Sequence, residues 1–193
     1  MRVLFLSPHA DDAELWAGGT IASHPEWQIM HLILTGNSTP ERSEEIKNAG
    51  RVLGVEAEVY HFEDTKLYES VEDIRELFEE LQHGFAPELV FCPPAGDRHQ
   101  DHQTVYEEAR RAFRFCSMLG YDTPYNEPAN RPTCYLPITK DNIGRKIEAC
   151  RCYESQAHQP YMQPEVIESL ARVRGCEIRT EFAEAFEVVR WIL

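Results

Sequence analysis

The sequence predicts an α/β fold in which helices cover both faces of a single doubly wound, mostly parallel sheet. Three observations lead to this prediction. Short apolar segments recur along the chain, longer amphipathic segments follow them, and polar residues rich in His and Asp come soon after two of the apolar segments. Short apolar runs are typical of parallel strands buried on both faces. Strands and helices in alternation give right-handed βαβ units in a Rossmann-like sandwich.

Each element follows from its local pattern. The apolar segments predict strands at 2–6, 28–34, 58–62 and 89–92, and later strands at 133–136 and 186–192. The amphipathic segments predict helices at 18–24, 40–53, 71–83, 103–118, 142–153 and 164–173.

The helix at 40–53 has sequence signals at both ends. It is preceded by Ser38 and Thr39, begins at Pro40, and is followed by Gly54. Proline in the first turn and glycine after the last turn are typical of helix ends. By contrast, residues 121–132 contain three prolines and two asparagines, which predicts a surface loop able to cover a site.

The composition is that of a globular protein. Of 193 residues, 42% are hydrophobic and 27% are charged, and this length suits one domain over residues 1–193. The formal charge of -14 repels phosphates and argues against nucleic acid as a partner. The apolar segments are far shorter than the ~18 residues of a membrane span, and the chain starts with a strand-like run in place of a signal peptide. We therefore expect a cytoplasmic protein with no membrane span.

Two polar clusters follow two of the predicted strands. Residues 7–14 (SPHADDAE) come directly after the first strand, and residues 97–102 (DRHQDH) come soon after the strand at 89–92. Ligands bind at the carboxyl ends of the strands in a doubly wound sheet, so both clusters are expected at one edge. Their residue types are those of a metal site.

Two histidines and a carboxylate, with one position left open, describe a catalytic zinc site. His9, Asp12 and His102 fit this set. The neighbouring Asp11 and Asp12 cannot both face the metal in the same way, so one is expected to be a ligand and the other a base. The spacing alone leaves open which carboxylate has which role.

The two motifs resemble those of the zinc-dependent N-acetylglucosamine deacetylases of the LmbE-like and PIG-L superfamily, which includes the mycothiol and bacillithiol biosynthetic deacetylases. The resemblance rests on HADDAEL at 9–15, GGT at 18–20 and HQDH at 99–102, and weaker signatures extend it over nearly the whole chain. The sequence departs from the family pattern at Ala10, where proline is usual. It also departs at Trp16, whose bulk is expected to change the shape of the substrate pocket.

The resemblance implies a mechanism for these positions. His9, Asp12 and His102 would hold Zn²⁺, and Asp11 would be the general base that activates water. The reaction would remove an acetyl or similar acyl group from the nitrogen of a small amino sugar or sugar conjugate. Zinc is known to lower the pKa of bound water to about 7. A site with two imidazoles and one carboxylate is also expected to accept other first-row divalent ions.

The resemblance further implies supporting roles for four residues. His99, oriented by Asp101, would stabilise the oxyanion or protonate the leaving amine, and Arg42 and Asp64 would contact the substrate. Two simpler interpretations stand beside these roles, because Arg42 can pair with Glu45 three residues later on the helix, and Asp64 can be a turn residue.

Two other functions are compatible with parts of the pattern. A metal-dependent phosphoesterase also uses carboxylate and histidine ligands, although such sites commonly hold two metals. A non-catalytic nucleotide-binding or sensory α/β module would share the fold, but the sequence has neither G-x-G-x-x-G nor G-x-x-x-x-G-K-[ST]. The zinc-dependent deacetylase accounts for both clusters.

Overall fold

The computed structural model describes residues 1–35, 39–127, 129 and 131–192. Within these residues, seven strands form one sheet in the order β3-β2-β1-β4-β5-β7-β6. The strands are β1 (Arg2–His9), β2 (Gln28–Thr35), β3 (Ala57–Val59), β4 (Leu89–Cys92), β5 (Ser117–Tyr121), β6 (Cys134–Ile138) and β7 (Phe182–Arg190). Neighbouring strands from β3 to β5 are parallel, and β7 is antiparallel to both β5 and β6. This confirms the predicted mostly parallel α/β sheet.

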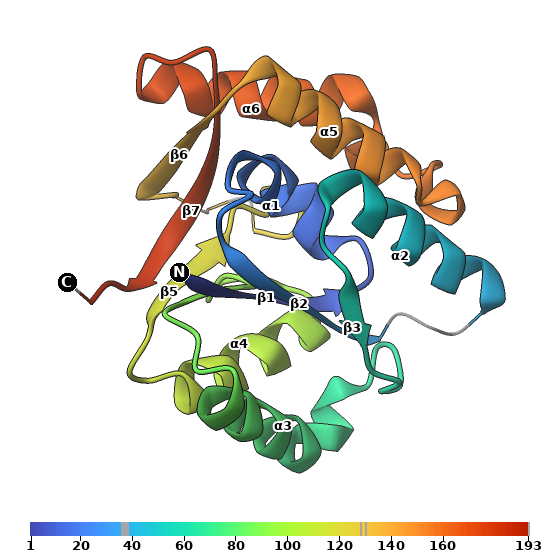
Figure 1. Ribbon diagram of the computed structural model, residues 1–193, viewed down its shortest axis with the longest axis vertical. Coiled ribbons are helices and arrows are strands. Elements are labelled where there is room, and N and C mark those ends of the chain that lie inside the picture. Colours follow the sequence, from blue (N-terminus) through green and yellow to red (C-terminus); the bar gives the residue numbers. More distant parts are fainter. Residues whose placement is uncertain (36–38, 128, 130, 193) are drawn as a thin grey trace.

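The helices form a layer on each side of the sheet (Figure 1). The α-helices are α1 (Asp12–Ser23), α2 (Pro40–Leu53), α3 (Val71–Gly84), α4 (Gln100–Ala112), α5 (Lys140–Arg151) and α6 (Pro164–Glu177). Short 3-10 turns lie at η1 (Leu67–Ser70), η2 (Glu154–Gln156) and η3 (Pro160–Met162). Helices α1, α2, α5 and α6 cover one face, and α3 and α4 cover the other. None of the described helices is long and apolar enough to cross a membrane.

Strand β1 shows why its sequence is continuously apolar. The side chains of Val3 and Phe5 belong to the core beneath α1, α2, α5 and α6, whereas those of Leu4 and Leu6 belong to the core beneath α3 and α4. All four are fully buried, because successive strand residues point to opposite faces and both faces are covered. β1 is therefore an interior strand, paired with β2 on one side and β4 on the other.

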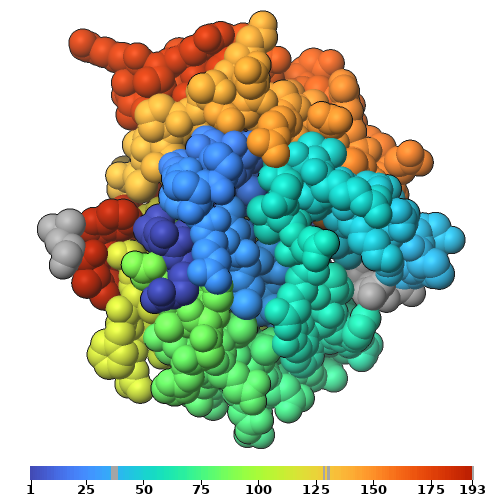
Figure 2. All heavy atoms as spheres, in the orientation of Figure 1, coloured from blue at the N-terminus to red at the C-terminus, as the bar shows by residue number. Residues whose placement is uncertain are grey.

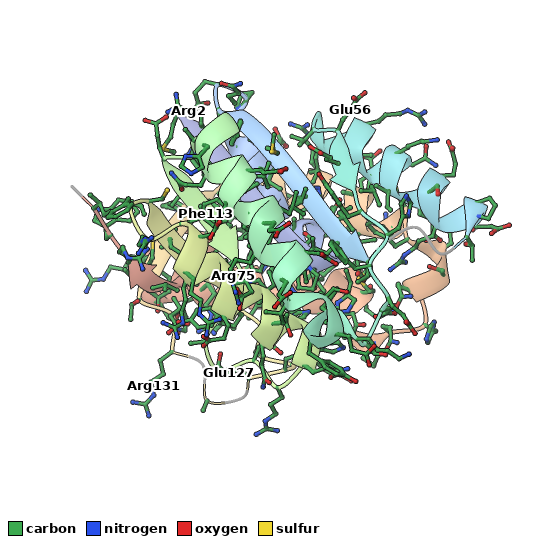
Figure 3. All side chains as sticks on the ribbon, turned by 90° about the horizontal axis from the view of Figure 1, so that it is seen from below. Arg2, Glu56, Arg75, Phe113, Glu127 and Arg131 are labelled. Atoms are coloured by element: carbon green, nitrogen blue, oxygen red, sulfur yellow. The ribbon has the colours of Figure 1, made fainter. Side chains whose placement is uncertain are left out.

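Contacts between helices complete both layers. On the α3–α4 side, Arg75 lies between the two helices (Figure 3) and its Nε is 2.8 Å from an oxygen of Glu108 on α4. On the opposite side, α2 and α5 lie next to each other, and the space-filling view shows α2 in contact with the C-terminal half of the chain (Figure 2). The two packed helix layers hold in place the loops at the carboxyl edge of the sheet.

The ends of α2 are as predicted. Thr39 Oγ1 accepts a hydrogen bond from the backbone N–H of Arg42 at 3.2 Å, and Pro40 is the first helical residue. Gly54 ends the helix with φ 78°, a left-handed conformation that glycine adopts without steric cost. Ser38, the other residue expected near this cap, lies outside the described residues.

The helix predicted at 103–118 is wrong at its C-terminal end. Helix α4 ends at Ala112, and the chain then forms β5, in which Met118 and Leu119 are buried in the two opposite cores. A short apolar run buried on both faces has no periodicity that separates strand from helix. For the same reason α1 begins at Asp12, earlier than its predicted start, because nearly every residue of this helix is buried.

A buried ion pair joins α5 to the sheet beside α1. Lys146 Nζ on α5 lies 2.6 Å from Oε1 of Glu184 on β7, and both side chains are buried. The Glu184 carboxylate also accepts hydrogen bonds from the backbone N–H groups of Gly19 at 2.9 Å and Thr20 at 2.6 Å. Glu184 therefore fixes α1, whose first turn carries the Asp11-Asp12 pair, against the end of the sheet.

Lys146→Met should lower the free energy of unfolding by about 3–5 kcal/mol, because it leaves the Glu184 carboxylate buried without its cation. Urea unfolding followed by circular dichroism measures this change. Lys47→Met is the matched control, since Lys47 is about two-thirds exposed and its pair with Glu44 has an N···O distance of 4.0 Å. The control should change little, because exposed ion pairs contribute little. Equal effects of the two variants would contradict the structural role of Lys146.

Candidate metal centre and active site

The two polar clusters meet at the carboxyl edge of the sheet. β1 and β4 are neighbours at the point where the strand order reverses, and this is where ligands bind in doubly wound sheets. His9 is the last residue of β1, and the chain leaving β4 turns into α4, whose first turn carries His102. The rings of His9 and His102 face each other, with His102 Nε2 3.3 Å from His9 Nδ1.

The third member of this group is Asp12, the first residue of α1. Its Oδ2 lies 3.5 Å from His9 Nδ1, and its Oδ1 lies 3.5 Å from His102 Nε2. Zinc bonds of about 2.0–2.2 Å place two tetrahedral ligands roughly 3.3–3.5 Å apart. The two nitrogens and the carboxylate therefore have the spacing that one divalent ion requires. Asp12 is further fixed because Oδ2 accepts the backbone N–H of His9 at 2.8 Å.

Each histidine uses its second nitrogen on a carboxylate. His102 Nδ1 lies 2.8 Å from Asp97 Oδ2, and His9 Nε2 lies 3.2 Å from Asp101 Oδ2 and 3.3 Å from Asp64 Oδ1. When each ring is neutral, these carboxylates accept its N–H, and the nitrogen that faces Asp12 is then the acceptor. Metal-binding histidines typically have this outer hydrogen bond, which fixes the tautomer and ring orientation.

Asp97 is the residue of this site to which the sequence reasoning assigned no role. Its buried carboxylate accepts hydrogen bonds from Thr123 Oγ1 at 3.2 Å, Asn126 Nδ2 at 3.3 Å and the backbone N–H of His99 at 2.9 Å, in addition to its contact with the ring Nδ1 of His102. The sequence contains one signal for this role, because Asp97 precedes the candidate ligand His102 by five residues and the start of α4 lies between them. The 121–132 segment thus reaches the site through the described residues Thr123 and Asn126.

The surrounding carboxylates favour positive charge at the centre. Burial alone would lower the pKa of His9, but its hydrogen bonds to Asp101, Asp12 and Asp64 outweigh burial and raise this pKa well above the ordinary value. Burial opposes ionisation of Asp12, yet the charges of His102 and His9 hold its pKa well below the usual range. A bound cation would supply the same positive charge as the protons on these imidazoles.

The prediction that the Asp101 carboxylate orients His99 is wrong. That carboxylate faces His9 and accepts the backbone N–H groups of Thr65 at 2.8 Å and Leu67 at 3.1 Å. His99 caps α4 instead, and its Nδ1 accepts the backbone N–H of Asp101 at 3.2 Å. Burial and the neighbouring histidines lower the pKa of His99. Because Nδ1 is the acceptor in this contact, a neutral His99 ring carries its proton on Nε2.

His99 also offers an alternative set of ligands. Nitrogens of His9, His99 and His102 lie within 4.8 Å of one another. We favour Asp12 over His99 as the third ligand, because the Asp12 oxygens lie within 3.5 Å of both histidine nitrogens and His99 Nδ1 already accepts a backbone hydrogen bond.

Asp11 lies next to this group in a constrained turn. The carbonyl of the preceding Ala10 accepts a hydrogen bond from Tyr153 Oη at 2.6 Å, which holds the turn in place of the proline expected there. The Asp11 side chain is buried, and its Oδ1 lies 3.6 Å from Arg42 Nη2. Burial and the Asp12 carboxylate raise the pKa of Asp11, and the Arg42 charge partly offsets this. A raised carboxyl pKa suits a group that gains and loses a proton.

The two residues considered for substrate contact both lie beside the centre. Arg42 forms the expected helix pair with Glu45 at 3.2 Å, yet it also donates to Ser155 Oγ at 2.8 Å and approaches Asp11. Asp64 lies in a turn, with its side chain 68% exposed and one oxygen against His9. Both residues line the cavity of about 280 Å³ that contains His9, Asp11, Asp12, His99 and His102. Arg42 thus forms the helix pair with Glu45 and also lies at the site. Asp64 is likewise a turn residue that also lies at the site.

Asp101→Asn should weaken zinc affinity by roughly 10–100-fold, the usual effect of removing an outer hydrogen-bond partner of a metal-binding histidine. Competition with a chromogenic chelator measures this affinity. Asp73→Asn, at an exposed position in the first turn of α3, is the control for the loss of one negative charge. Unchanged affinity together with a shifted pH profile of turnover would return Asp101 to the role of orienting His99.

The fold and the site define a class of protein, namely a doubly wound α/β protein in which two histidines and several carboxylates gather at the switch point of its sheet. The model of the PIG-L family, described as GlcNAc-PI de-N-acetylase, matches residues 4–113, more than half of the chain. The chain belongs to this family, which confirms the resemblance seen in the sequence motifs.

Individual relatives agree with this assignment. The chain is 28% identical over 167 residues to the uncharacterized deacetylase YaiS of Escherichia coli K12, covering 79% of this chain and 90% of that protein. The conserved protein TT1542 of Thermus thermophilus is 27% identical with a TM-score of 0.81, over 99% of this chain and 95% of that one.

Two more distant structures share the fold. The N,N'-diacetylchitobiose deacetylase of Pyrococcus horikoshii is 21% identical with a TM-score of 0.80, over 97% of this chain and 83% of that one. The 4-carboxy-2-hydroxymuconate hydratase GalB of Pseudomonas putida KT2440 is 20% identical with a TM-score of 0.79, over 100% and 97% of the two chains. Because the fold includes a hydratase, the reaction must be argued from the site itself.

Proposed function

We propose that this protein is a zinc-dependent hydrolase that removes an acyl group, such as acetyl, from the nitrogen of an amino sugar or sugar conjugate. The observation that carries the proposal is one cavity that brings together His9, Asp12 and His102 at ligand spacing with the buried carboxylate of Asp11. A metal face beside a separate acid–base group is the arrangement that amide hydrolysis by water needs.

His9, Asp12 and His102 would hold the ion, with their rings fixed by Asp101 and Asp97. A bound divalent ion would polarise the amide carbonyl and lower the pKa of a water molecule. Zinc suits two imidazoles and one carboxylate, and other first-row divalent ions would retain part of the activity in such a site.

The remaining steps fall to side chains around the same cavity. The Asp11 carboxylate accepts a proton from the attacking water, and Arg42, 3.6 Å away, holds it in place. The Nε2–H of His99 donates a hydrogen bond to the oxygen on which charge develops, an interaction that strengthens in the transition state. Asp11 then returns its proton to the departing nitrogen. His99 therefore acts as a neutral donor in this scheme.

A polar cavity beside the centre fits a hydroxyl-rich substrate. This second cavity, of about 680 Å³, shares His9, Arg42, Asp64 and Gln156 with the metal cavity, and its lining is completed by Thr35, Thr39, Glu41, His61, Phe62, Glu63 and Ser155. Carboxylates and a guanidinium that are partly open to solvent are suited to sugar hydroxyls. Arg42 and Asp64, at the junction of the two cavities, are therefore proposed to orient the sugar.

The alternative functions fit the site less well. A two-metal phosphoesterase would need a second group of ligands, and the available group of His9, Asp64 and Asp101 reuses His9, whose neutral ring cannot give both nitrogens to metals. A net charge of -14 also opposes a phosphate substrate. A sensory module does not require a buried acid–base carboxylate such as Asp11 beside a group of metal-binding side chains.

The test is release of acetate and free amine from N-acetylglucosamine and its conjugates by purified protein. Activity should disappear with a chelator and return with zinc, and cobalt or manganese should restore part of it. Turnover that survives complete metal removal would contradict the proposal. Hydrolysis of p-nitrophenyl phosphate without any amide cleavage would support the phosphoesterase instead.

A further inference from the structure

A third cavity, apolar and about 640 Å³ in volume, adjoins the metal cavity, and neither Arg42 nor Asp64 lines it. Helix α6, which contacts β7 and lies at the top of Figure 1, forms one wall with Val166, Leu170, Ala171 and Val173. The opposite wall comes from Ala183 and Ala185 of β7. Val166 and Val173 of its lining are 47% and 53% exposed, so the cavity is accessible from solvent.

Four side chains belong to both the apolar cavity and the metal cavity. They are Leu15 and Trp16 from α1, Tyr125 and Tyr161. The two tyrosine rings contact each other, with centroids 5.0 Å apart. The two cavities therefore adjoin each other at Leu15, Trp16 and the tyrosine pair.

Most charged groups around the apolar cavity already have partners within the protein. Arg174 binds Asp122 through two contacts of 2.6 and 3.2 Å, and Lys146 binds Glu184 at 2.6 Å. Glu165 is the remaining charged residue among the described residues that line the cavity, and it lies at the exposed start of α6. An uncharged apolar group would be accommodated without leaving any of these ions unpaired.

The polar and apolar cavities share different residues with the metal cavity, and they differ in chemistry. An amide substrate has two substituents, the acyl group on carbon and the sugar on nitrogen. The polar cavity with Arg42 and Asp64 suits the sugar, so the acyl group must point the other way, toward Leu15 and Trp16. An acetyl methyl is comparable in size to one water molecule of about 30 Å³. It would leave nearly all of the apolar cavity unfilled.

We infer that the acyl group removed by this protein is a linear apolar chain longer than acetyl, which lies in the cavity between α6 and β7. This inference rests on the proposed function and specifies its substrate as an N-acylated amino sugar with a medium-length acyl chain. Water is the co-reactant, and the products are the free carboxylic acid and the amino sugar. Cleavage of the C–N bond places the OH of water on the acyl carbon and its other hydrogen on the amine nitrogen.

The experiment compares kcat/KM of the zinc-loaded protein for N-acetyl-, N-butanoyl-, N-hexanoyl- and N-octanoylglucosamine. Each methylene that enters the cavity should raise kcat/KM by about two- to fourfold, since burial of one CH₂ accounts for about a fourfold effect when complete. Octyl N-acetylglucosaminide is the matched probe, because it carries an eight-carbon chain on the sugar side of the amide. It should show no comparable gain over N-acetylglucosamine.

Two variants place the effect in the cavity. Val166→Glu introduces a charge into the apolar lining at a position that is 47% exposed, and Ala171→Phe fills the cavity from α6. Each should reduce the ratio of kcat/KM for the octanoyl and acetyl substrates toward one. Val188→Glu is the control, because Val188 is 39% exposed on β7 and outside the cavity. The control should retain the ratio, and thermal unfolding checks that Ala171→Phe folds.

The outcomes separate this inference from the proposed function. Hydrolysis of the acetyl substrate with no increase along the series would overturn the inference and leave the proposed function standing. A gain for the octyl glycoside alone would place the apolar group on the sugar side and also overturn it. A change of oligomeric state in Val166→Glu with an unchanged substrate ratio would show that α6 contacts a second copy instead. Failure to cleave any amide would overturn both proposals.

Discussion

Asp11→Asn should reduce kcat for amide hydrolysis by about 10²–10⁴-fold, the usual contribution of an acid–base group, and should leave zinc bound. The substitution keeps the size of the side chain and its polar contact with Arg42, 3.6 Å away in the native protein. The amide, however, cannot accept the proton of water. Free amine released at saturating zinc measures the turnover, and atomic emission spectrometry of the same sample measures the metal.

Asp141→Asn is the control for this variant, because Asp141 is exposed in the first turn of α5 and its loss removes the same charge. It should have nearly native turnover. If Asp11→Asn instead loses its zinc, Asp11 is a ligand and its role must be exchanged with that of Asp12. Native turnover with full metal would show that Asp11 is not the base.

Much of the fold and the position of the site could be predicted because both depend on local patterns. The apolar runs of β1 and β4 are short and end in polar clusters, and parallel strands bring their carboxyl ends to one edge. Hence the meeting of His9 and His102 follows from the sequence once the two strands are adjacent. The caps of α2, Thr39 and Gly54, are equally local.

What the sequence did not predict depends on contacts between distant segments. Asp101 faces His9 because the backbone N–H groups of Thr65 and Leu67, more than thirty residues earlier, hold its carboxylate there. The motif HQDH is equally compatible with an Asp101 carboxylate that contacts His99 and with one that contacts His9. The partnership of Asp97 with Thr123 and Asn126 likewise joins segments that are far apart in the chain.

The strand β5 shows the same limit for secondary structure. Helix α4 is amphipathic, and the residues that follow it are also partly apolar. The periodicity of the sequence therefore does not indicate where the helix ends. Met118 and Leu119 lie in different cores only because both faces of the sheet are covered. The tertiary arrangement therefore decides between strand and helix at this point.

Asp12→Asn should have the opposite effect to Asp11→Asn, with a loss of metal as the primary defect. Its zinc affinity should fall by more than the roughly 10–100-fold that loss of an outer hydrogen-bond partner costs, because a charged ligand is removed. Each oxygen of the Asp12 carboxylate has its own contact. Oδ2 accepts the backbone N–H of His9 at 2.8 Å, and Oδ1 lies 3.5 Å from His102 Nε2. Asparagine has one oxygen and can satisfy only one of these.

Excess zinc distinguishes this defect from a loss of the base. Because Asp11 is intact in Asp12→Asn, turnover should rise with added zinc toward a plateau, whereas Asp11→Asn should not respond. A zinc titration of amine release for both variants, with bound metal measured at each point, tests the two roles together. If Asp12→Asn kept its metal at native affinity, His99 would replace Asp12 as the third ligand, since its nitrogen lies within 4.8 Å of those of His9 and His102.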